Sequence, residues 1–273
     1  MAELYNKFYG FKEAPFNITP DPRFLYLSEK HRDALNHLLF GIQQRKGFIQ
    51  LTGEVGAGKT TLCRALLGKL GENYKTALIL NPCLTETQLL QAIVKEFGLE
   101  AEEQSRVGYL ETLNKFLLEQ VAEGNDVVLI IDEAQDLTTE LLEQVRLLSN
   151  LETDDRKLLQ IVLMGQPELR DKLNHRSLRQ LRQRITVRYH LRPLTRHESE
   201  QYIHHRIQVC GGNGLPAFNN WAMRKVFRYS RGIPRLINAV CDKTLLCGFV
   251  EGTDRFCARH VRRAIRELEG NFA

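Results

Sequence analysis

The sequence lacks any long hydrophobic run. Its most apolar uninterrupted stretch is Val127 to Ile131, whereas a membrane-spanning helix needs about 20 apolar residues. The opening residues, MAELYNKFYGFKEAPF, have no apolar segment behind a basic start, so they do not form a signal peptide. Internal repeats and low-complexity stretches are also missing. We therefore expect a cytoplasmic globular protein with no transmembrane segment in this chain.

Cysteine pairs with metal-ligand spacing are absent as well. The 6 cysteines contain no C-x-x-C pair and have no histidines at matching distances. This pattern argues against a zinc site and favours buried, reduced thiols in a cytoplasmic protein. The cysteines are Cys63, Cys83, Cys210, Cys241, Cys247 and Cys257.

Acidic residues are scarce in the last third of the chain. Residues 1–169 contain 17 Lys and Arg against 25 Asp and Glu, a net charge of −8, and residues 170–273 contain 21 against 8, a net charge of +13. Two such halves could meet head to tail between subunits, or the basic half could face an anion such as nucleic acid or anionic lipid. A plain solvated arginine surface is the simpler alternative.

One motif is complete. The stretch GEVGAGKTT satisfies the phosphate-loop pattern G-x-x-x-x-G-K-[ST] through Gly53, Gly58, Lys59 and Thr60. Its backbone N–H groups converge on phosphate at a helix N-terminus, Lys59 reaches the β- and γ-phosphates, and Thr60 offers a hydroxyl to Mg²⁺. The pattern predicts an ATP or GTP binder. The loop residues expected to contact the nucleotide are Gly53, Glu54, Val55, Gly56, Ala57, Gly58, Lys59, Thr60 and Thr61.

Strand and helix patterns alternate around this loop, which predicts a parallel sheet with helices on both faces, an αβα core. After Thr195 only helical patterns remain, so we expect a small all-helical domain there. The expected strands are residues 47–52, 76–81, 127–132 and 157–165, with an edge strand at 185–191. The expected helices are residues 31–44, 60–70, 86–98, 107–122 and 138–150.

Polar residues follow the third and fourth expected strands. Asp132 and Glu133 end VVLIIDE, the pattern in which Asp132 holds the Mg²⁺ shell and Glu133 deprotonates the attacking water. Gln166 follows the fourth strand and is expected to lie between the first and third strands, beside the γ-phosphate. The alternatives are surface carboxylates for the first pair and a plain turn held by Pro167 for Gln166.

Basic residues then accumulate. Between Arg170 and Arg196 there are nine Lys and Arg and one acid, Asp171. Arg182 and Arg184 precede the edge strand, where an arginine can reach the γ-phosphate of a neighbouring subunit, although an ordinary basic helix has the same composition. In RGIPRLIN, Arg235 lies in the first turn of a helix, where a cation is unfavourable unless an anion compensates it.

The segment before the core, Phe16 to Ser28, carries two prolines and several apolar side chains. Phe16, Ile18 and Tyr26 could wrap a flat ligand such as an adenine ring. Packing of the segment against the protein is equally compatible with this composition.

In this order, GEVGAGKTT, VVLIIDEAQ, LLQIVLMGQPELR and RGIPRLIN resemble an AAA+ ATPase, and more narrowly the general secretion pathway protein A family. The opening FYGFKEAPFNITPDPRFLYLSEKHRDAL is also typical of that family. The resemblance implies a P-loop NTPase core with a helical lid, ATP and Mg²⁺ as cofactors, and nucleotide-dependent self-assembly. By the same resemblance Arg235 is the second nucleotide sensor and Gln166 occupies the position of the first.

The resemblance also predicts the organisation of the chain. Residues 1–30 form an N-terminal segment contacting nucleotide, residues 31–192 the ATPase core, and residues 193–273 the lid. Long family members continue into a membrane span and a peptidoglycan-binding domain, neither of which is expected here. The expected function is ATP hydrolysis driving a secretion, pilus or polysaccharide-export machine of the envelope, at a cytoplasmic location peripheral to the inner membrane. The alternative is a DNA-binding ATPase of the transposition-regulator type.

Overall fold

The computed structural model describes residues 2–17, 21–80, 82, 84–152, 157–212 and 214–270. The chain divides into two compact units. The sheet unit comprises residues 31–53 and 62–191, and the helical unit comprises residues 1–30, 54–61 and 192–273. The functional roles expected for segments 1–30, 31–192 and 193–273 stay predictions.

Strands and helices alternate along the sheet unit, as the sequence predicts. The strands are β1 (Phe48–Gly53), β2 (Tyr74–Ile79), β3 (Asp126–Ile131), β4 (Leu159–Gly165) and β5 (Ile185–Leu191). The helices are α2 (Glu29–Gln43), α3 (Lys59–Leu67), α4 (Glu86–Glu96), α5 (Arg106–Ala122), α6 (Thr139–Leu148), α7 (Pro167–Leu173) and α8 (Arg179–Arg184).

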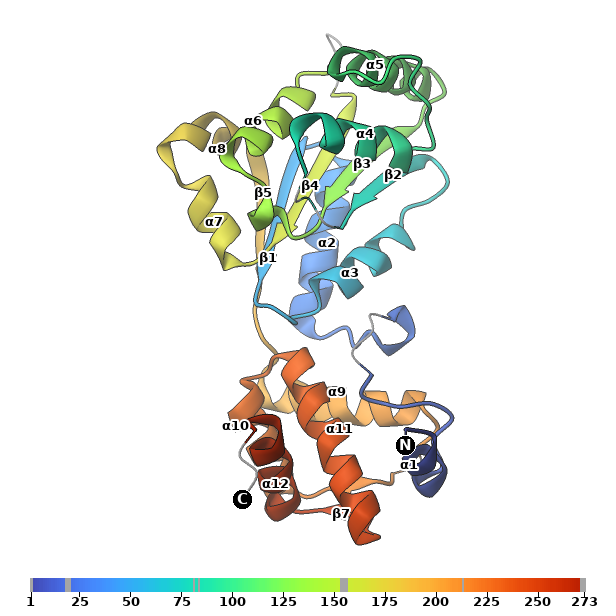
Figure 1. Ribbon diagram of the computed structural model, residues 1–273, viewed down its shortest axis with the longest axis vertical. Helices are drawn as coiled ribbons and strands as arrows, with labels where there is room; N and C mark the ends of the chain where they lie inside the picture. Colours follow the sequence, from blue (N-terminus) through green and yellow to red (C-terminus); the bar gives the residue numbers. More distant parts are fainter. Residues whose placement is uncertain are drawn as a thin grey trace. The chain divides into compact units, whose positions relative to one another are not determined.

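The five strands form one parallel sheet in the order β2-β3-β4-β1-β5. Figure 1 shows them side by side with helices on both faces. The predicted position of β4 between β1 and β3 is confirmed, and so is the position of β5 at the edge. Because the strands are parallel, the residues that follow β1, β3 and β4 begin at the same edge of the sheet. Thr52 of β1 lies beside Gly165 of β4 at this edge.

Alternate residues of each strand face opposite sides of the sheet. On one side, Leu129 of β3 and Ile161 of β4 belong to a buried cluster that includes residues of α4, α5, α6 and α7. On the other side, Gly41 lets α2 lie close to β1, because a Cβ there would be 2.6 Å from Cδ1 of Ile49. Burial on both faces explains why β1, β3 and β4 are almost wholly apolar in sequence.

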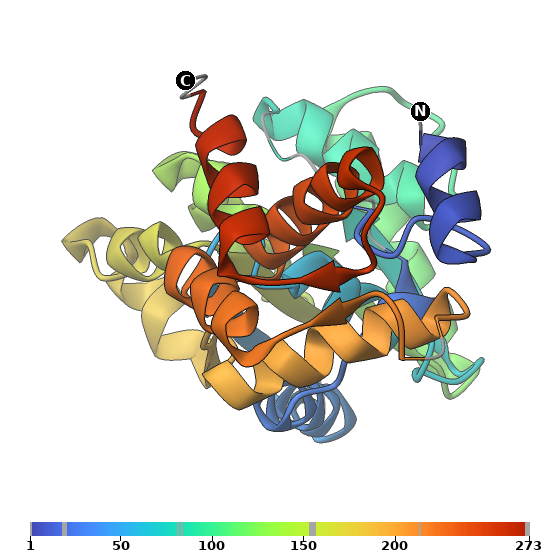
Figure 2. The same ribbon diagram turned by 90° about the horizontal axis from the view of Figure 1, so that it is seen from below.

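The helical unit is built from α1 (Ala2–Tyr9), α9 (Arg196–Val209), α10 (Asn220–Ser230), α11 (Pro234–Glu251) and α12 (Ala258–Leu268). Figure 2 shows α9 to α12, in orange and red, around a short pair of strands. These are β6 (Ala217–Phe218) and β7 (Arg255–Phe256), which pair in parallel. The expectation of an all-helical domain therefore misses this pair, because strands of two residues carry no readable alternation.

The N-terminal segment is anchored inside the helical unit by Arg206 of α9. Its guanidinium donates to the carbonyl oxygens of Pro15 and Asn17, the latter at 3.0 Å, and to the Tyr202 hydroxyl at 2.9 Å. The same group lies 4.5 Å from the ring centroid of Phe24. Arg206 is only 6% exposed, so its charge is stabilised by carbonyl dipoles and aromatic faces rather than by water.

Candidate functional site

The phosphate loop begins where β1 ends, at Gly53. Gly56 and Gly58 have φ of 76° and 100°, a region that only glycine adopts without strain, and α3 begins directly afterwards at Lys59. Ala57 N donates to Glu54 O at 3.0 Å, which closes the turn. The predicted strand, loop and helix therefore occur in the expected order. The loop leads directly into the N-terminus of α3.

Lys59 is 5% exposed, and its Nζ donates to the carbonyl oxygen of Glu54 at 3.2 Å. Burial of an ammonium group is costly, and a carbonyl within the loop offsets part of this cost. The Lys59 ammonium is thus held against the loop itself. Thr60 and Thr61 are half-buried in the first turn of α3.

Arg235 packs against the phosphate loop. Its backbone N donates to Gly56 O at 3.3 Å, and a Cβ on Gly56 would overlap the Arg235 side chain. Glycine is therefore required at position 56 for two reasons, the positive φ and the close approach of α11. The structure thus brings together the loop and Arg235, which the sequence places in the first turn of a helix.

The carboxylates form a second group, at the end of β3. Asp132 is 2% exposed, and its Oδ1 accepts from the backbone N of Glu133 at 2.9 Å. Glu133 has φ 50° and ψ 37°, a left-handed conformation that costs a non-glycine residue energy and is concentrated at functional sites. The chain thus turns sharply immediately after β3, at the residue expected to act on water.

Two amides hold the Glu133 carboxylate. Its Oε2 accepts from Gln135 Nε2 at 2.9 Å and from Gln166 Nε2 at 3.2 Å. Gln135 Oε1 in turn accepts from the backbone N of Gln166 at 3.0 Å. Gly165 makes room for this contact, because a Cβ there would lie 2.7 Å from Gln135 Oε1. Gln166, Glu133 and Gln135 therefore form one hydrogen-bonded group in the sheet unit.

Gln135 and Lys172 were missed by sequence reasoning. Lys172 Nζ of α7 donates to the carbonyl oxygens of Gln135 and Leu137, at 2.5 and 2.8 Å, and so fixes the loop that carries Glu133. A signal for Gln135 exists in the sequence, since it lies two residues after Glu133 in DEAQ. Lys172 carries no such signal, because its partners are backbone atoms.

The two arginines before β5 differ in their surroundings. Arg184 Nη1 donates to Ser149 Oγ at 2.6 Å, and Ser149 is buried at the C-terminus of α6, where a cation is favourable. Arg182 Nη1 donates to Asn174 Oδ1 at 3.3 Å and lines a pocket. Action of either arginine on a neighbouring subunit stays a prediction.

The aromatic residues of the N-terminal segment lie in the helical unit. Phe16 is 2% exposed within its apolar core, and the Tyr26 ring lies 6.2 Å from that of Tyr202. Ile18 lies outside the described residues. The packing alternative therefore accounts for Phe16 and Tyr26 as they stand, and their contact with a nucleotide base stays a prediction.

One known protein family matches the middle of the chain. The family described as AAA domain matches residues 42–173, a range that contains the phosphate loop, the β3 carboxylates and Gln166. The chain has the AAA+ P-loop fold. Among solved structures, this AAA+ fold is similar to the Aeropyrum pernix ORC2 protein in its ADPNP–ADP complexes, with TM-score 0.69 and 18% identity over 96% of this chain and 73% of that chain. It is also similar to the Drosophila ORC bound to DNA, with TM-score 0.70 and 18% identity over 97% of this chain and 66% of that chain.

A relative in sequence is general secretion pathway protein A of Aeromonas hydrophila. It is 46% identical to this chain over 268 residues, which cover 98% of this chain and 49% of the relative. The chain thus spans about half the length of the curated relative that it matches. Within the described part of the chain, no helix combines the length and the apolar character needed to cross a membrane.

Proposed function

We propose that this chain binds ATP with Mg²⁺ and hydrolyses it. The observation that carries the proposal is the Glu133 carboxylate, held by Gln135 and Gln166 on a left-handed turn directly after β3. A strained, doubly hydrogen-bonded carboxylate contributes nothing obvious to folding. It is suited to orienting a water molecule and accepting its proton.

The roles follow from the chemistry of each group. Lys59 and the loop amides from Gly53 to Thr61 bind the phosphates, and Thr60 and Asp132 hold the magnesium ion, which neutralises phosphate charge when bound. No group of three or more His, Cys, Asp and Glu within the described residues could hold a metal alone. This fits Mg²⁺, which takes few protein ligands and completes its shell with phosphate oxygens and water.

Glu133 accepts the proton of the attacking water. Since its Oε2 already accepts from two amides, Oε1 is the atom that takes the proton. Gln166 and Gln135 keep the carboxylate from rotating, so the water is held in line before bond cleavage. Arg235, next to Gly56, adds positive charge at the phosphate loop.

A nucleotide titration tests the binding half of this proposal. Lys59→Ala should weaken binding of a fluorescent ATP analogue at least tenfold, because the ammonium charge on the phosphates is lost. Lys69→Ala is the matched control, since Lys69 is an exposed lysine just beyond α3. Equal affinities in the two variants would contradict the assignment of the phosphate loop.

We further propose that subunits assemble head to tail around the nucleotide. The support is the charge asymmetry, −8 for residues 1–169 and +13 for residues 170–273, together with Arg182 and Arg184 before the edge strand. A head-to-tail contact either closes into a ring or continues as a filament. Activity per subunit should then rise with protein concentration. Sedimentation with a non-hydrolysable ATP analogue checks the assembly itself directly.

The relative's name supports a role at a secretion, pilus or polysaccharide-export machine, on the cytoplasmic side of the inner membrane. The alternative is binding to duplex DNA, which is favoured by the exposed Arg259, Arg262 and Arg266 of α12. A gel-shift titration against salt separates the two, because binding through phosphate contacts falls steeply as salt rises. If the chain binds no duplex DNA at any salt concentration, the envelope role is favoured.

A further inference from the structure

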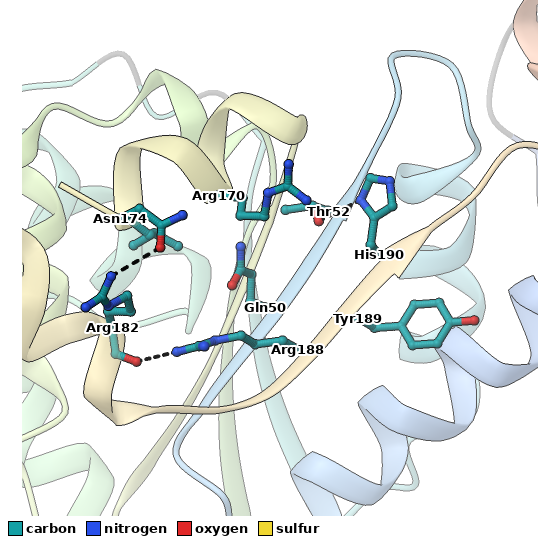
Figure 3. Close-up of a pocket in the computed structure, with 9 residues that line it drawn as sticks. Gln50, Thr52, Arg170, Asn174, Arg182, Arg188, Tyr189 and His190 are labelled. Atoms are coloured by element: carbon teal, nitrogen blue, oxygen red, sulfur yellow. Dashed lines mark hydrogen bonds between the residues drawn. The ribbon is translucent and has the colours of Figure 1, made fainter.

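A pocket lies in the sheet unit beside β1 and β5, and α7 and α8 form its other walls (Figure 3). Its volume is about 280 Å³, and none of the phosphate-loop residues 54–61 lines it. Three arginines reach it from three elements, Arg170 from α7, Arg182 from α8 and Arg188 from β5. The pocket therefore contains none of the residues proposed to bind nucleotide within the same subunit, although β1 contributes to both sites.

Among the residues that the structure describes, no carboxylate lines this pocket. Arg182 donates to Asn174, and Arg188 Nη2 donates to the carbonyl oxygen of Arg182, so both guanidiniums contact neutral acceptors. Arg170 has only the exposed Asp171, 3.8 Å away and outside the lining. Three like charges around one concavity repel one another, and a bound anion would remove this repulsion.

Gln50 points to a ligand independently of the arginines. It lies on β1, it is only 5% exposed, and its side chain is directed into the pocket between Arg170 and Arg188 (Figure 3). The structure gives its amide no hydrogen-bond partner among the described residues. Because this amide lines the pocket, a molecule bound there can form hydrogen bonds with it. Two residues along β1, by contrast, Thr52 is paired with His190 at 3.0 Å.

We propose that this pocket binds a phosphoryl group. A carboxylate has two coplanar oxygens, whereas guanidiniums from three elements and an amide from a fourth match the oxygens of a tetrahedral anion. The volume is just below the usual range for drug-sized ligands, which suits a phosphate or a short phosphate ester. Such a group reaches the pocket either as a soluble phosphate or as a lipid headgroup.

The test uses the full chain with Lys59→Ala, so that the phosphate loop does not compete. Pyrophosphate should raise the melting temperature of this variant and bind in calorimetry, whereas acetate at equal ionic strength should do neither. Adding Arg188→Gln should weaken binding at least tenfold. Adding Arg176→Gln should leave it unchanged, because Arg176 is an exposed arginine outside the pocket with the same charge change.

Gln50→Leu gives a second test, in which a loss of binding cannot be attributed to unfolding of the variant. It should keep the melting temperature without ligand and weaken pyrophosphate binding, since an amide that can hydrogen-bond to the anion is replaced by an apolar group of similar size. Flotation with vesicles of phosphatidylcholine, with and without phosphatidic acid, identifies the source. Binding of soluble pyrophosphate or of phosphatidic acid vesicles, lost in Arg188→Gln, supports the proposal. Equal binding in Arg188→Gln and Arg176→Gln, binding of duplex DNA alone, or equal binding of acetate would overturn it.

Discussion

Arg206→Ala should detach the N-terminal segment from the helical unit and destabilise that unit by about 3–5 kcal/mol, since two or more hydrogen bonds from a charged donor are lost. Arg206 donates to two carbonyl oxygens of the segment and to the Tyr202 hydroxyl, and hydrogen bonds from charged donors contribute about 1.5–3 kcal/mol each. The Pro15 carbonyl would lose its charged partner. The stacking of the guanidinium on Phe24 would also be lost.

Two further substitutions of Arg206 separate the contribution of its hydrogen bonds from that of its stacking on Phe24. Arg206→Met keeps most of the volume over Phe24 but none of the hydrogen bonds, and Arg206→Lys keeps the charge but not the planar fork. We expect the loss of stability to rise in the order Lys, Met, Ala. If stacking alone held the segment, Met would match the wild type.

Urea unfolding followed by circular dichroism and by tryptophan emission measures this change, because the single tryptophan, Trp221, lies on α10 of the helical unit. Limited proteolysis should also cut the Ala variant within residues 1–28 first. A change in the free energy of unfolding below about 1 kcal/mol, with unaltered proteolysis, would refute the reasoning, since one or two such hydrogen bonds already exceed it.

Three other outcomes follow from the structure. Gly232→Ala should destabilise the helical unit by about 2 kcal/mol or more, because Gly232 has φ 80° and a Cβ there would overlap the Leu194 backbone; unchanged urea unfolding would count against this. At pH 8, the partly exposed Cys257 should react with a thiol reagent before Cys63, because burial and the nearby Asp132 raise the pKa of the Cys63 thiol to about 12. Peptide mass spectrometry shows the order of labelling, and early labelling of Cys63 would be inconsistent with this reasoning. Arg182→Ala should slow hydrolysis with little change in nucleotide affinity, and mixing it with a Glu133→Gln variant should restore part of the activity; a strictly monomeric enzyme with no restoration would exclude action between subunits.

The sheet and the phosphate loop were predictable because their signals are local. The apolar run from Val127 to Ile131 in β3 indicates a strand buried on both faces, and the glycines of the loop are dictated by backbone conformation. The order β2-β3-β4-β1-β5 was predictable only in part. The location of Gln166 between β1 and β3 came from the resemblance to known P-loop proteins as much as from spacing.

The remaining features depend on contacts between distant parts of the chain. Gln135 bridges Glu133 and Gln166, which is 31 residues further along, and Lys172 binds backbone atoms that no sequence pattern marks. Arg206 meets the carbonyl of Asn17 across 189 residues. The wrapping of apolar residues around a base and their packing in a core have the same composition, so Phe16 could not be assigned from the sequence.

Single-turnover hydrolysis by Glu133→Gln tests the central claim most directly. The amide keeps the shape of the side chain but cannot accept a proton, so the variant should bind ATP as the wild type does and cleave it about 10²–10⁴ times more slowly. Glu111→Gln, an exposed glutamate on α5, is the matched control and should retain the wild-type rate. A Glu133→Gln variant that releases phosphate at the wild-type rate would contradict the assignment of Glu133, and with it the account of this site.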